Sequence, residues 1–363
     1  MTKRSAKLAV LRGDGIGPEI ADATLRVLEA VAGPCGLDLV YEEAEIGFDA
    51  LNRIGGTFPE ESFAVAQAAD GTILGPVSHN EYPPVAEGGL NPSGELRKRL
   101  DLFANIRPAK TIPGLPPRCG TSVDLVIVRE NTEGFYADRN MSAGSGEFMP
   151  TPDVALAVRK ITRTGATRIA EAAFEIALKR ARKKVTAVHK ANVLRLSDGL
   201  YLECTRQVAR RYPGVEYEER IVDAMAALLV RDASAFDVIV TTNMFGDILS
   251  DQAAEISGSL VLAASLNAGE RHAVAQAQHG SAPDIAGRDI ANPASLIGSA
   301  AMLLHWIGER RGEAAFGRGA VIIQDALETT ISVPETRTRD LGGALGTRAF
   351  ADAVITAIRS RTE

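Results

Sequence analysis

The chain has 363 residues, 45% of them hydrophobic and 24% charged, a composition typical of a globular protein with one or two apolar cores. Its net charge of −6 argues against nucleic-acid binding through charge alone. No apolar run approaches the length of a membrane-spanning helix. From the charge and the lack of such a run we expect neither a nucleic-acid nor a membrane partner.

The first residues lack the apolar stretch of a signal peptide. The cysteines, Cys35, Cys119 and Cys204, are scattered and have no C-x-x-C spacing, which indicates reduced thiols that fill packing space. We therefore expect a cytoplasmic protein.

Strand-like and helical patterns alternate along most of the chain. The strand patterns lie at 7–14, 37–47, 69–77, 122–130, 185–190, 215–223 and 235–243. The clearest helical patterns lie at 18–36, 166–184 and 197–213. Such alternation predicts an α/β sheet covered on both faces. A glycine-rich stretch at 140–151 interrupts the alternation and is interpreted as a loop or an excursion toward a partner subunit.

A cluster of bases closes the helical pattern at 166–184: Lys179, Arg180, Arg182, Lys183 and Lys184. Cations at the C-terminus of a helix complement its dipole. We therefore interpret the cluster as a solvated helix end rather than as a nucleic-acid patch.

Two aspartates, Asp247 and Asp251, follow the strand pattern at 235–243 and stand four residues apart. On a helix this spacing puts both carboxylates on one face, where they suit Mg²⁺ or Mn²⁺. Solvated surface acids have the same spacing, so the pair alone leaves both interpretations open. The preceding strand favours a site, because ligands of α/β folds gather at the carboxyl ends of strands.

Arginines at 97, 107 and 129 could form the cluster of guanidinium forks that a di- or tricarboxylate requires, and each alone could equally form a structural salt bridge. Tyr136 and Lys190 form a candidate acid/base pair. The turn at 12–20 does not satisfy the G-x-G-x-x-G dinucleotide fingerprint.

Seven motifs occur in the order found in the β-decarboxylating dehydrogenases: GDGIGPE, DLFANIRPAK, VIVRENTEGFY, HKANVL, FGDILSDQAA, HGSAPDIAG and DLGGALGT. The chain resembles this family of isocitrate, homoisocitrate and 3-isopropylmalate dehydrogenases over nearly its whole length. The resemblance implies an α/β fold of two domains with a long central mixed sheet, distinct from a standard Rossmann fold. It implies one domain from residues 1–102 and 258–363, and a central domain, 103–257, with the metal site and an arm that clasps a second subunit.

The resemblance also implies the roles of individual residues. Asp247 and Asp251 would bind Mg²⁺ or Mn²⁺ together with Asp223 of a second subunit in a homodimer or higher oligomer. The hydroxy-carboxylate substrate would be bound by Arg97, Arg107, Arg129, Asn91 and Ser93. Lys190, from the other subunit, would remove the 2-hydroxyl proton, and Tyr136 would donate a proton to C3 after decarboxylation.

Binding of NAD is implied for the residues His279, Gly280, Ser281, Ala282, Pro283, Asp284, Ile285 and Asn292. Asp284 and Ile285 stand where users of NADP place lysine and tyrosine, so the resemblance predicts NAD. One departure is that Gln276, Ala277 and Gln278 replace the usual Glu-Pro-Val, which removes an acid expected near the cofactor.

The substrate depends on the segment before Arg97. Enzymes for 3-isopropylmalate usually carry leucines where this chain has Ser93 and Gly94, so an apolar wall is missing. We therefore predict a polar C3 substituent, as in isocitrate or homoisocitrate. The alternatives are 3-isopropylmalate, favoured by the VDAMA segment, D-malate or tartrate, and a non-catalytic regulatory subunit. The last is disfavoured because Tyr136, Lys190 and the three aspartates are all present.

Overall fold

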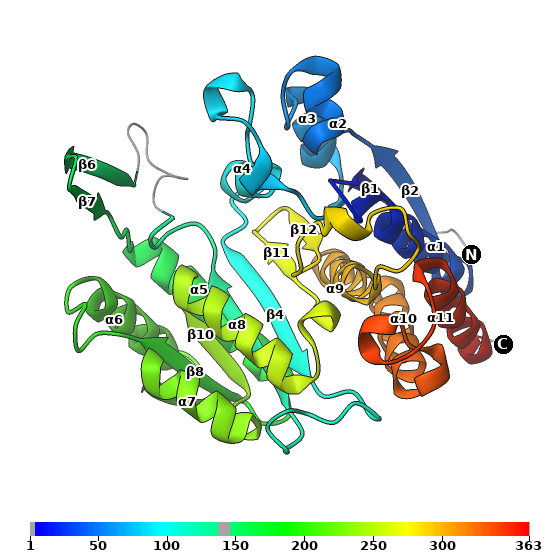
Figure 1. The fold of residues 1–363 in the computed structure, drawn as a ribbon. Helices are drawn as coiled ribbons and strands as arrows, with labels where there is room; N and C mark the ends of the chain where they lie inside the picture. The colour runs from blue at the N-terminus through cyan, green and yellow to red at the C-terminus, as the bar shows by residue number, and fades with distance from the viewer. Residues whose placement is uncertain (1–3, 137–145, 363) are drawn as a thin grey trace.

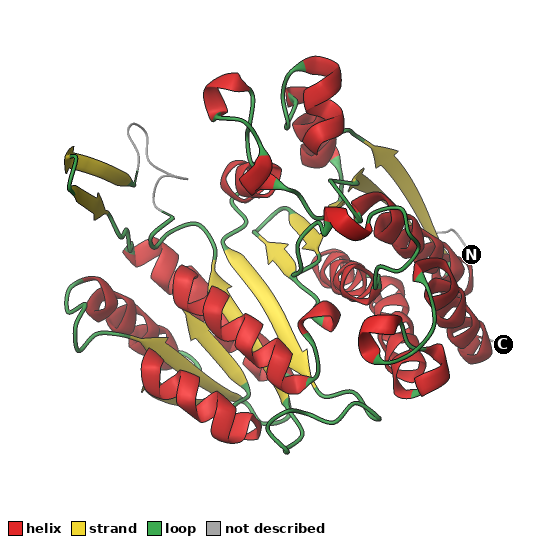
Figure 2. Ribbon diagram, viewed as in Figure 1, coloured by secondary structure: helices red, strands yellow, loops and turns green. Residues whose placement is uncertain are grey.

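The structure, a computed structural model, describes residues 4–136 and 146–362. Within these residues the chain forms a ten-stranded mixed sheet with helices on both faces (Figures 1 and 2). The strand order is β2-β1-β3-β12-β11-β4-β5-β10-β8-β9. The predicted α/β fold with a long central mixed sheet is thus confirmed.

The strands are β1 (Arg4–Leu11), β2 (Leu37–Glu43), β3 (Gly71–Leu74), β4 (Ala104–Lys110), β5 (Asp124–Glu130), β6 (Glu147–Thr151), β7 (Val154–Ala157), β8 (Lys184–His189), β9 (Glu216–Ile221), β10 (Val238–Thr241), β11 (Leu266–Ala268) and β12 (Ala273–Gln276). The α-helices are α1 (Gly17–Cys35), α2 (Gly47–Ile54), α3 (Glu60–Ala68), α4 (Pro92–Arg99), α5 (Arg163–Lys179), α6 (Ser197–Ala209), α7 (Val222–Asp232), α8 (Asn243–Ser257), α9 (Ala294–Arg311), α10 (Ala314–Ser332) and α11 (Thr347–Thr362).

The middle of the sheet is antiparallel and its two flanks are parallel. Strands β12, β11, β4 and β5 run antiparallel to their neighbours in this series, whereas β3, β1 and β2 on one side and β10, β8 and β9 on the other pair in parallel. The register pairs Arg129 of β5 with Asn105 of β4 on one side and with Thr241 of β10 on the other. Arg129 therefore lies beside the start of α8, which begins two residues after Thr241.

Strand β5 is apolar on both faces because helices cover it from both sides. Val126 and Val128 pack with α5 and α6, whereas the alternate residues Leu125 and Ile127 pack with α7 and α8. Successive side chains of a strand point to opposite faces, so burial on both faces requires a continuous apolar run. The same requirement accounts for the VIV run of β10.

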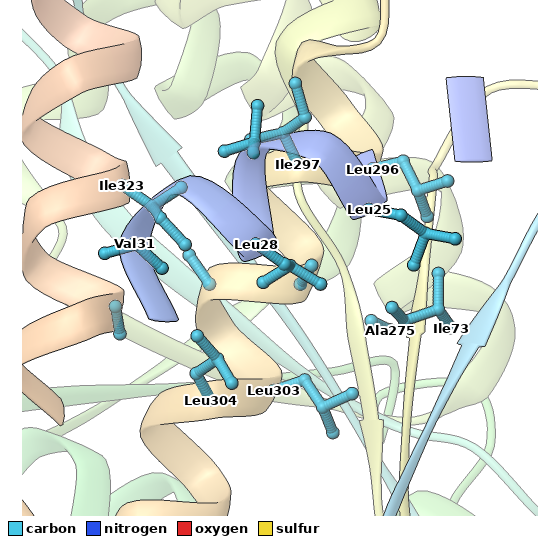
Figure 3. Packing of buried hydrophobic residues seen from close by; sticks show 14 of the residues in the cluster. Leu25, Leu28, Val31, Ile73, Ala275, Leu296, Ile297, Leu303, Leu304 and Ile323 are labelled. Atoms are coloured by element: carbon cyan, nitrogen blue, oxygen red, sulfur yellow. The ribbon is translucent and has the colours of Figure 1, made fainter. Parts of the chain in front are cut away.

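A second set of helices covers the other end of the sheet. Helices α1, α9, α10 and α11 pack against β1, β3, β11 and β12, and the close-up in Figure 3 shows Leu28 of α1 and Leu304 of α9 in this cluster. Both chain ends lie at the same edge of the molecule, where α1 packs against α11 (Figure 1). The division into domains at residues 102/103 and 257/258 stays a prediction, since one sheet runs through both parts.

The cluster of bases after α5 differs from its sequence interpretation. Arg180 pairs with Asp124 and with the buried Asp237, and Arg182 donates to the backbone oxygens of Ser234 and Phe236. The prediction of a solvated end was wrong for Arg180, because it pairs with the Asp237 carboxylate, which is 1% exposed and needs a cation, whereas Arg182 is 41% exposed.

Two further expectations concern segments of the chain. Of the stretch 140–151, residues 140–145 lie outside the described residues, and β6 and β7 form an exposed two-stranded hairpin projecting from the body (Figure 1). Among the residues that the structure describes, no helix combines the length and apolarity needed to cross a membrane. Cys35 and Cys204 are buried in the cores as free thiols, as predicted.

Candidate active site

A cleft with a cavity of about 290 Å³ lies between α4, the antiparallel middle of the sheet and the loop after β12. Its lining includes nine of the residues predicted from the sequence: Asn91, Ser93, Arg97, Arg107, Arg129, Tyr136, Asp247, His279 and Gly280. These residues come from segments up to 189 positions apart, yet the fold gathers them around one polar cavity.

Helix α8 contributes Asp247 to the lining of the cleft, and Asn243 and Asp251 lie one turn before and after it. Their spacing of four residues puts them on one face. Arg129, which is 2% exposed, is fixed by this face: its Nε donates to the backbone oxygen of Asn243 at 2.9 Å, and its Nη2 donates to the Asn243 Oδ1 at 2.6 Å. Its Nη1 donates to Asp247.

The close contact between Arg129 and α8 explains the glycine in the FGDILSD motif. A Cβ atom at Gly246 would lie 2.6 Å from the Cγ of Arg129. Only glycine leaves room for the buried arginine stem against this turn of the helix.

Arg107, on β4, joins the two aspartates. Its Nη1 donates to Ser250 at 2.7 Å and lies 3.2 Å from both the Asp247 and the Asp251 Oδ1 atoms. Burial, together with the nearby charge of Arg129, lowers the pKa of Arg107 to about 10, so it is still a cation at neutral pH. The buried positive charge makes this end of the cleft suited to carboxylates.

Helix α4 supplies the opposite wall. The Asn91 Oδ1 accepts from the backbone N–H of Gly94 at 3.2 Å and thereby caps the helix. The Ser93 hydroxyl donates to the Gln276 Oε1 at 3.0 Å, and the Arg97 Nη2 donates to the same atom at 3.4 Å. The resemblance to the family indicated that Gln276 replaces an acid near the cofactor. In the structure its side-chain oxygen faces the wall formed by α4.

Tyr136 lies at the edge of the cleft, half-buried, with the Arg129 guanidinium 5.9 Å from the centre of its ring. Tyr136 is the last described residue before the gap at 137–145.

Lys190 and Asp223 are not among the side chains that line this cleft. They pair with each other at 2.5 Å, Lys190 just after β8 and Asp223 in the first turn of α7. The hydrogen bond from Lys190 lowers the pKa of Asp223. The Asp223 side chain is 68% exposed, so the pair faces outward from this chain.

The residues Asp247 and Asp251 fit a hard divalent cation only in part. Both are ionisable oxygen ligands one helical turn apart, and Asp251 also accepts from Gln278 Nε2. Within residues 4–136 and 146–362, no group of three His, Cys, Asp or Glu side chains is placed to hold a metal. A cation on this helix face would need a further ligand from outside the residues that the structure describes.

The predicted cofactor residues form the loop between β12 and α9. A Cβ at Gly15 would lie 2.0 Å from the carbonyl oxygen of Ser281, so the GDGIGPE turn packs directly under this loop. Ala282 has φ of 39°, and Pro283 and Asp284 are exposed. Ile285 is half-buried against the core. The exposed turn leaves backbone and carboxylate groups available to a ligand.

Two side chains fix the ends of that loop. The Ser281 hydroxyl is 2.8 Å from the Ser78 hydroxyl, and Asn292 donates to Asp340 at 3.0 Å. The last contact ties the loop to the DLGGALGT motif. Burial lowers the pKa of His279, whose ring lies against the cleft.

Sequence reasoning missed two residues that hold the site together. Asn243 fixes Arg129, and its position four residues before Asp247 was the available signal. Asp14 accepts from the backbone N–H groups of Phe48 at 2.8 Å and Ser78 at 2.9 Å and from the Tyr82 hydroxyl, so it holds three loops beside the cleft. No local pattern could have indicated these partners, which are far apart in the chain.

A family model described as isocitrate/isopropylmalate dehydrogenase matches residues 7–354. The chain belongs to this family. The chain is 43% identical to the isocitrate/homoisocitrate dehydrogenase of Thermus thermophilus over 98% of this chain and 99% of that protein. It is 41% identical to the 3-isopropylmalate dehydrogenase of Methanothermobacter thermautotrophicus over 96% and 97% of the two chains.

A solved structure supports the same family. The crystal structure of isocitrate dehydrogenase from Methylococcus capsulatus superposes with a TM-score of 0.86 at 38% identity, covering 98% of this chain and 99% of that one. As a member of the isocitrate/isopropylmalate dehydrogenase family, the protein is an oxidoreductase that oxidises and decarboxylates 3-substituted malates.

Proposed function

We propose that the protein is an NAD-dependent, divalent-metal-dependent dehydrogenase whose malate substrate carries a polar C3 substituent, as in isocitrate or homoisocitrate. The observation that carries the proposal is the wall formed by α4: Ser93, Arg97 and Gln276 meet there in a hydrogen-bonded group. An apolar substituent would displace water from these polar groups without offering them a hydrogen bond, which is costly in a closed site.

The alternative substrate is 3-isopropylmalate, and relatives with both kinds of name have similar identity to this chain. Overall similarity therefore does not discriminate between the two kinds of substrate, and the proposal is based on the lining of the cleft. D-malate has no C3 substituent and tartrate has only a hydroxyl there, so neither would bring a carboxylate to the α4 wall. A regulatory subunit is disfavoured because the chain keeps the complete set of predicted catalytic and metal-binding residues.

In the proposed reaction, each of the predicted residues has its own role. Arg97, Arg107 and Arg129 hold the carboxylates of the malate core, and the segment before Arg97, with Asn91 and Ser93, contacts the C3 substituent. Lys190 of a second copy removes the 2-hydroxyl proton, and Tyr136 delivers a proton to C3 after CO₂ has left. Asp247 and Asp251 would hold Mg²⁺ or Mn²⁺, which would supply Lewis-acid stabilisation, and the loop between β12 and α9 would hold NAD, which would supply the acceptor for the hydride from C2.

A second copy of the chain is required in this proposal because Lys190 and Asp223 face away from their own cleft. Large apolar side chains lie exposed on the same elements: Val193 and Leu196 after β8, Val230 on α7 and Ile248 on α8, with exposed fractions from 60% to 90%. Such a cluster is typical of a protein–protein interface. We infer a homodimer in which each Lys190–Asp223 pair completes the partner's cleft.

NAD is proposed over NADP because Asp284 is exposed in the turn that follows Ser281. A carboxylate there accepts from ribose hydroxyls and repels a 2′-phosphate. We expect kcat/KM for NAD to exceed that for NADP by about 100-fold or more, equivalent to about 2.7 kcal/mol. Initial rates with the two cofactors, with and without EDTA, test the proposal. Preference for NADP would refute the cofactor assignment, and full activity in EDTA would refute the metal.

A further inference from the structure

A buried ion pair lies behind Lys190, at the base of the β6–β7 hairpin. Arg159, two residues after β7, donates through Nη1 to the Oδ1 of Asp198 in the first turn of α6. The two side chains are 8% and 0% exposed, and neither lines the cleft. A buried ion pair is weak evidence for stability, because taking both charges out of water offsets most of their attraction. A pair of this kind therefore calls for a role beyond stability.

The Asp198 carboxylate holds the backbone of Lys190. Its Oδ2 accepts from the Lys190 backbone N–H at 2.5 Å, while its Oδ1 receives Arg159. The Lys190 carbonyl oxygen accepts from the backbone N–H groups of Val193 at 2.9 Å and Leu194 at 2.8 Å. The backbone of Lys190 is thus held on both sides, and this fixes the direction in which its side chain leaves the chain.

The Arg159 guanidinium ties this carboxylate to elements that form the cleft. Its Nη1 also donates to the Ser197 hydroxyl at 2.8 Å, and its Nη2 donates at 3.1 Å to the hydroxyl of Thr242, directly before α8. The guanidinium carbon lies 5.8 Å from the ring centre of Phe135 and 5.5 Å from that of Phe245, within the range of cation–π attraction. These contacts hold the guanidinium in place, so the carboxylate has a fixed partner.

We propose that Asp198 is a positioning residue for the proposed general base: it fixes the backbone of Lys190, with Arg159 as its counter-ion, so that the lysine side chain enters the partner's cleft in one direction. The inference rests on the proposed function, in which Lys190 acts in the cleft of a second copy. Asp198 of one chain then governs the rate in the cleft of the other. A residue needed only for folding would affect its own cleft at least as strongly, because Arg159 also contacts Thr242 beside α8.

Subunit mixing tests this difference. Tyr136→Phe mixed with Lys190→Ala is the reference, in which each hybrid dimer has one intact site, built from Tyr136 of the Lys190→Ala chain and Lys190 of the Tyr136→Phe chain. Activity is measured with saturating NAD, Mn²⁺ and isocitrate or homoisocitrate, whichever the wild type turns over faster.

Asp198→Ala is then added to one chain or to the other. In the Tyr136→Phe chain it lies behind the working lysine, and the recovered kcat should fall at least about tenfold, because a misplaced base is inefficient. In the Lys190→Ala chain it leaves the working lysine with its native Asp198, and at least about threefold more activity should remain than in the first arrangement.

The matched control is Asp237→Ala in the Tyr136→Phe chain. Asp237 is likewise a buried carboxylate, 1% exposed, that pairs with an arginine, Arg180. It accepts from the backbone N–H of Lys184 at 3.2 Å, at the start of β8, whereas Asp198 acts directly after the end of that strand. Asp237→Ala should therefore leave the recovered kcat unchanged.

Equal losses in the two arrangements, a larger loss in the second, or an equal loss with Asp237→Ala would overturn the inference. If Asp198→Ala does not fold, adding Arg159→Met removes the unpaired buried charge. This double variant should still show the difference between the arrangements, because the acceptor for the Lys190 N–H is still missing, and no difference would again overturn the inference. An inactive reference mixture is a distinct result, which would refute the shared site of the proposed function and the inference with it.

Discussion

The Asp247 carboxylate lies between two buried guanidinium groups. Arg129 and Arg107 are 2% and 8% exposed, and both contact the Asp247 Oδ1. In the free protein this carboxylate offsets repulsion between the arginines. In the proposed complex with cation and substrate, the substrate carboxylates would take over that role.

Asp247→Asn should lower kcat by at least about 1,000-fold, because a metal ligand worth several kcal/mol in the transition state is weakened. We expect the free energy of unfolding to fall by only about 1–3 kcal/mol, so the variant should still fold. Turnover with Mn²⁺ and urea unfolding measure the two effects. Asp352→Asn, which breaks the surface pair with Arg26, should change neither appreciably. Full turnover by Asp247→Asn would exclude the metal assignment.

Burial lowers the pKa of His279 below its ordinary value of about 6.5, which predicts a pH-dependent stability. The unfolded chain protonates this ring as pH falls below about 6.5, whereas the folded chain resists protonation, so the unfolded state binds more protons and stability falls. His279→Gln should lose less stability than the wild type between pH 7.5 and pH 5, as measured by urea midpoints. The exposed His305→Gln is the control. Identical losses of stability in the wild type and in His279→Gln would contradict the lowered pKa of His279.

At the scale of elements, α8 brings most of the site together. Asp247 and Asp251 were predicted to share a face from their spacing alone, and the structure puts both beside Arg107. The contribution of Asn243 was missed, because an asparagine at the first position of a helix is ordinarily read as a capping residue. Its actual partner, Arg129, is 114 residues away and is brought near only by the β5–β10 pairing.

In the proposed dimer, Lys190 after β8 and Asp223 of α7 complete a neighbouring cleft, and subunit mixing tests this. Lys190→Ala and Tyr136→Phe should each be inactive. After subunit exchange, half of the dimers are hybrids with one intact site, so about a quarter of wild-type activity should return. Lys190→Ala mixed with Asp223→Asn is the matched control: both residues come from the same protomer, so every hybrid site lacks one of them and activity should stay absent.

Activity in that control would place Lys190 and Asp223 in different sites. Continued inactivity of the Lys190→Ala and Tyr136→Phe mixture, with exchange demonstrated by mass, would contradict the shared site.

At the scale of the whole molecule, the sequence predicted that helices cover both faces of the sheet better than it predicted the directions of the strands. Alternating patterns indicated helices on both faces, and β5 and β10 were recognisable as apolar runs buried on both sides. The antiparallel middle could not be predicted locally, because β11 has three residues and β12 has four. The resemblance to the family supplied the mixed sheet instead.

The same pairing determines which wall of the cleft Gln276 faces. In the sequence it stands three residues before the cofactor loop, which suggested a cofactor contact. In the fold, β12 pairs with β11 and puts Gln276 next to Asn267, facing α4. A one-dimensional motif carries no information on which wall of a cleft its residues face.

The central claim is that the cleft accepts a malate with a polar, carboxylate-bearing C3 substituent. The most direct measurement is kcat/KM from NADH formation by the purified protein with Mn²⁺, across isocitrate, homoisocitrate, 3-isopropylmalate, D-malate and tartrate. We predict the highest value for isocitrate or homoisocitrate, above 3-isopropylmalate by about tenfold or more, because the α4 wall offers charge and hydrogen bonds rather than apolar contact. A value for 3-isopropylmalate that exceeds both tricarboxylates by about tenfold would contradict the claim.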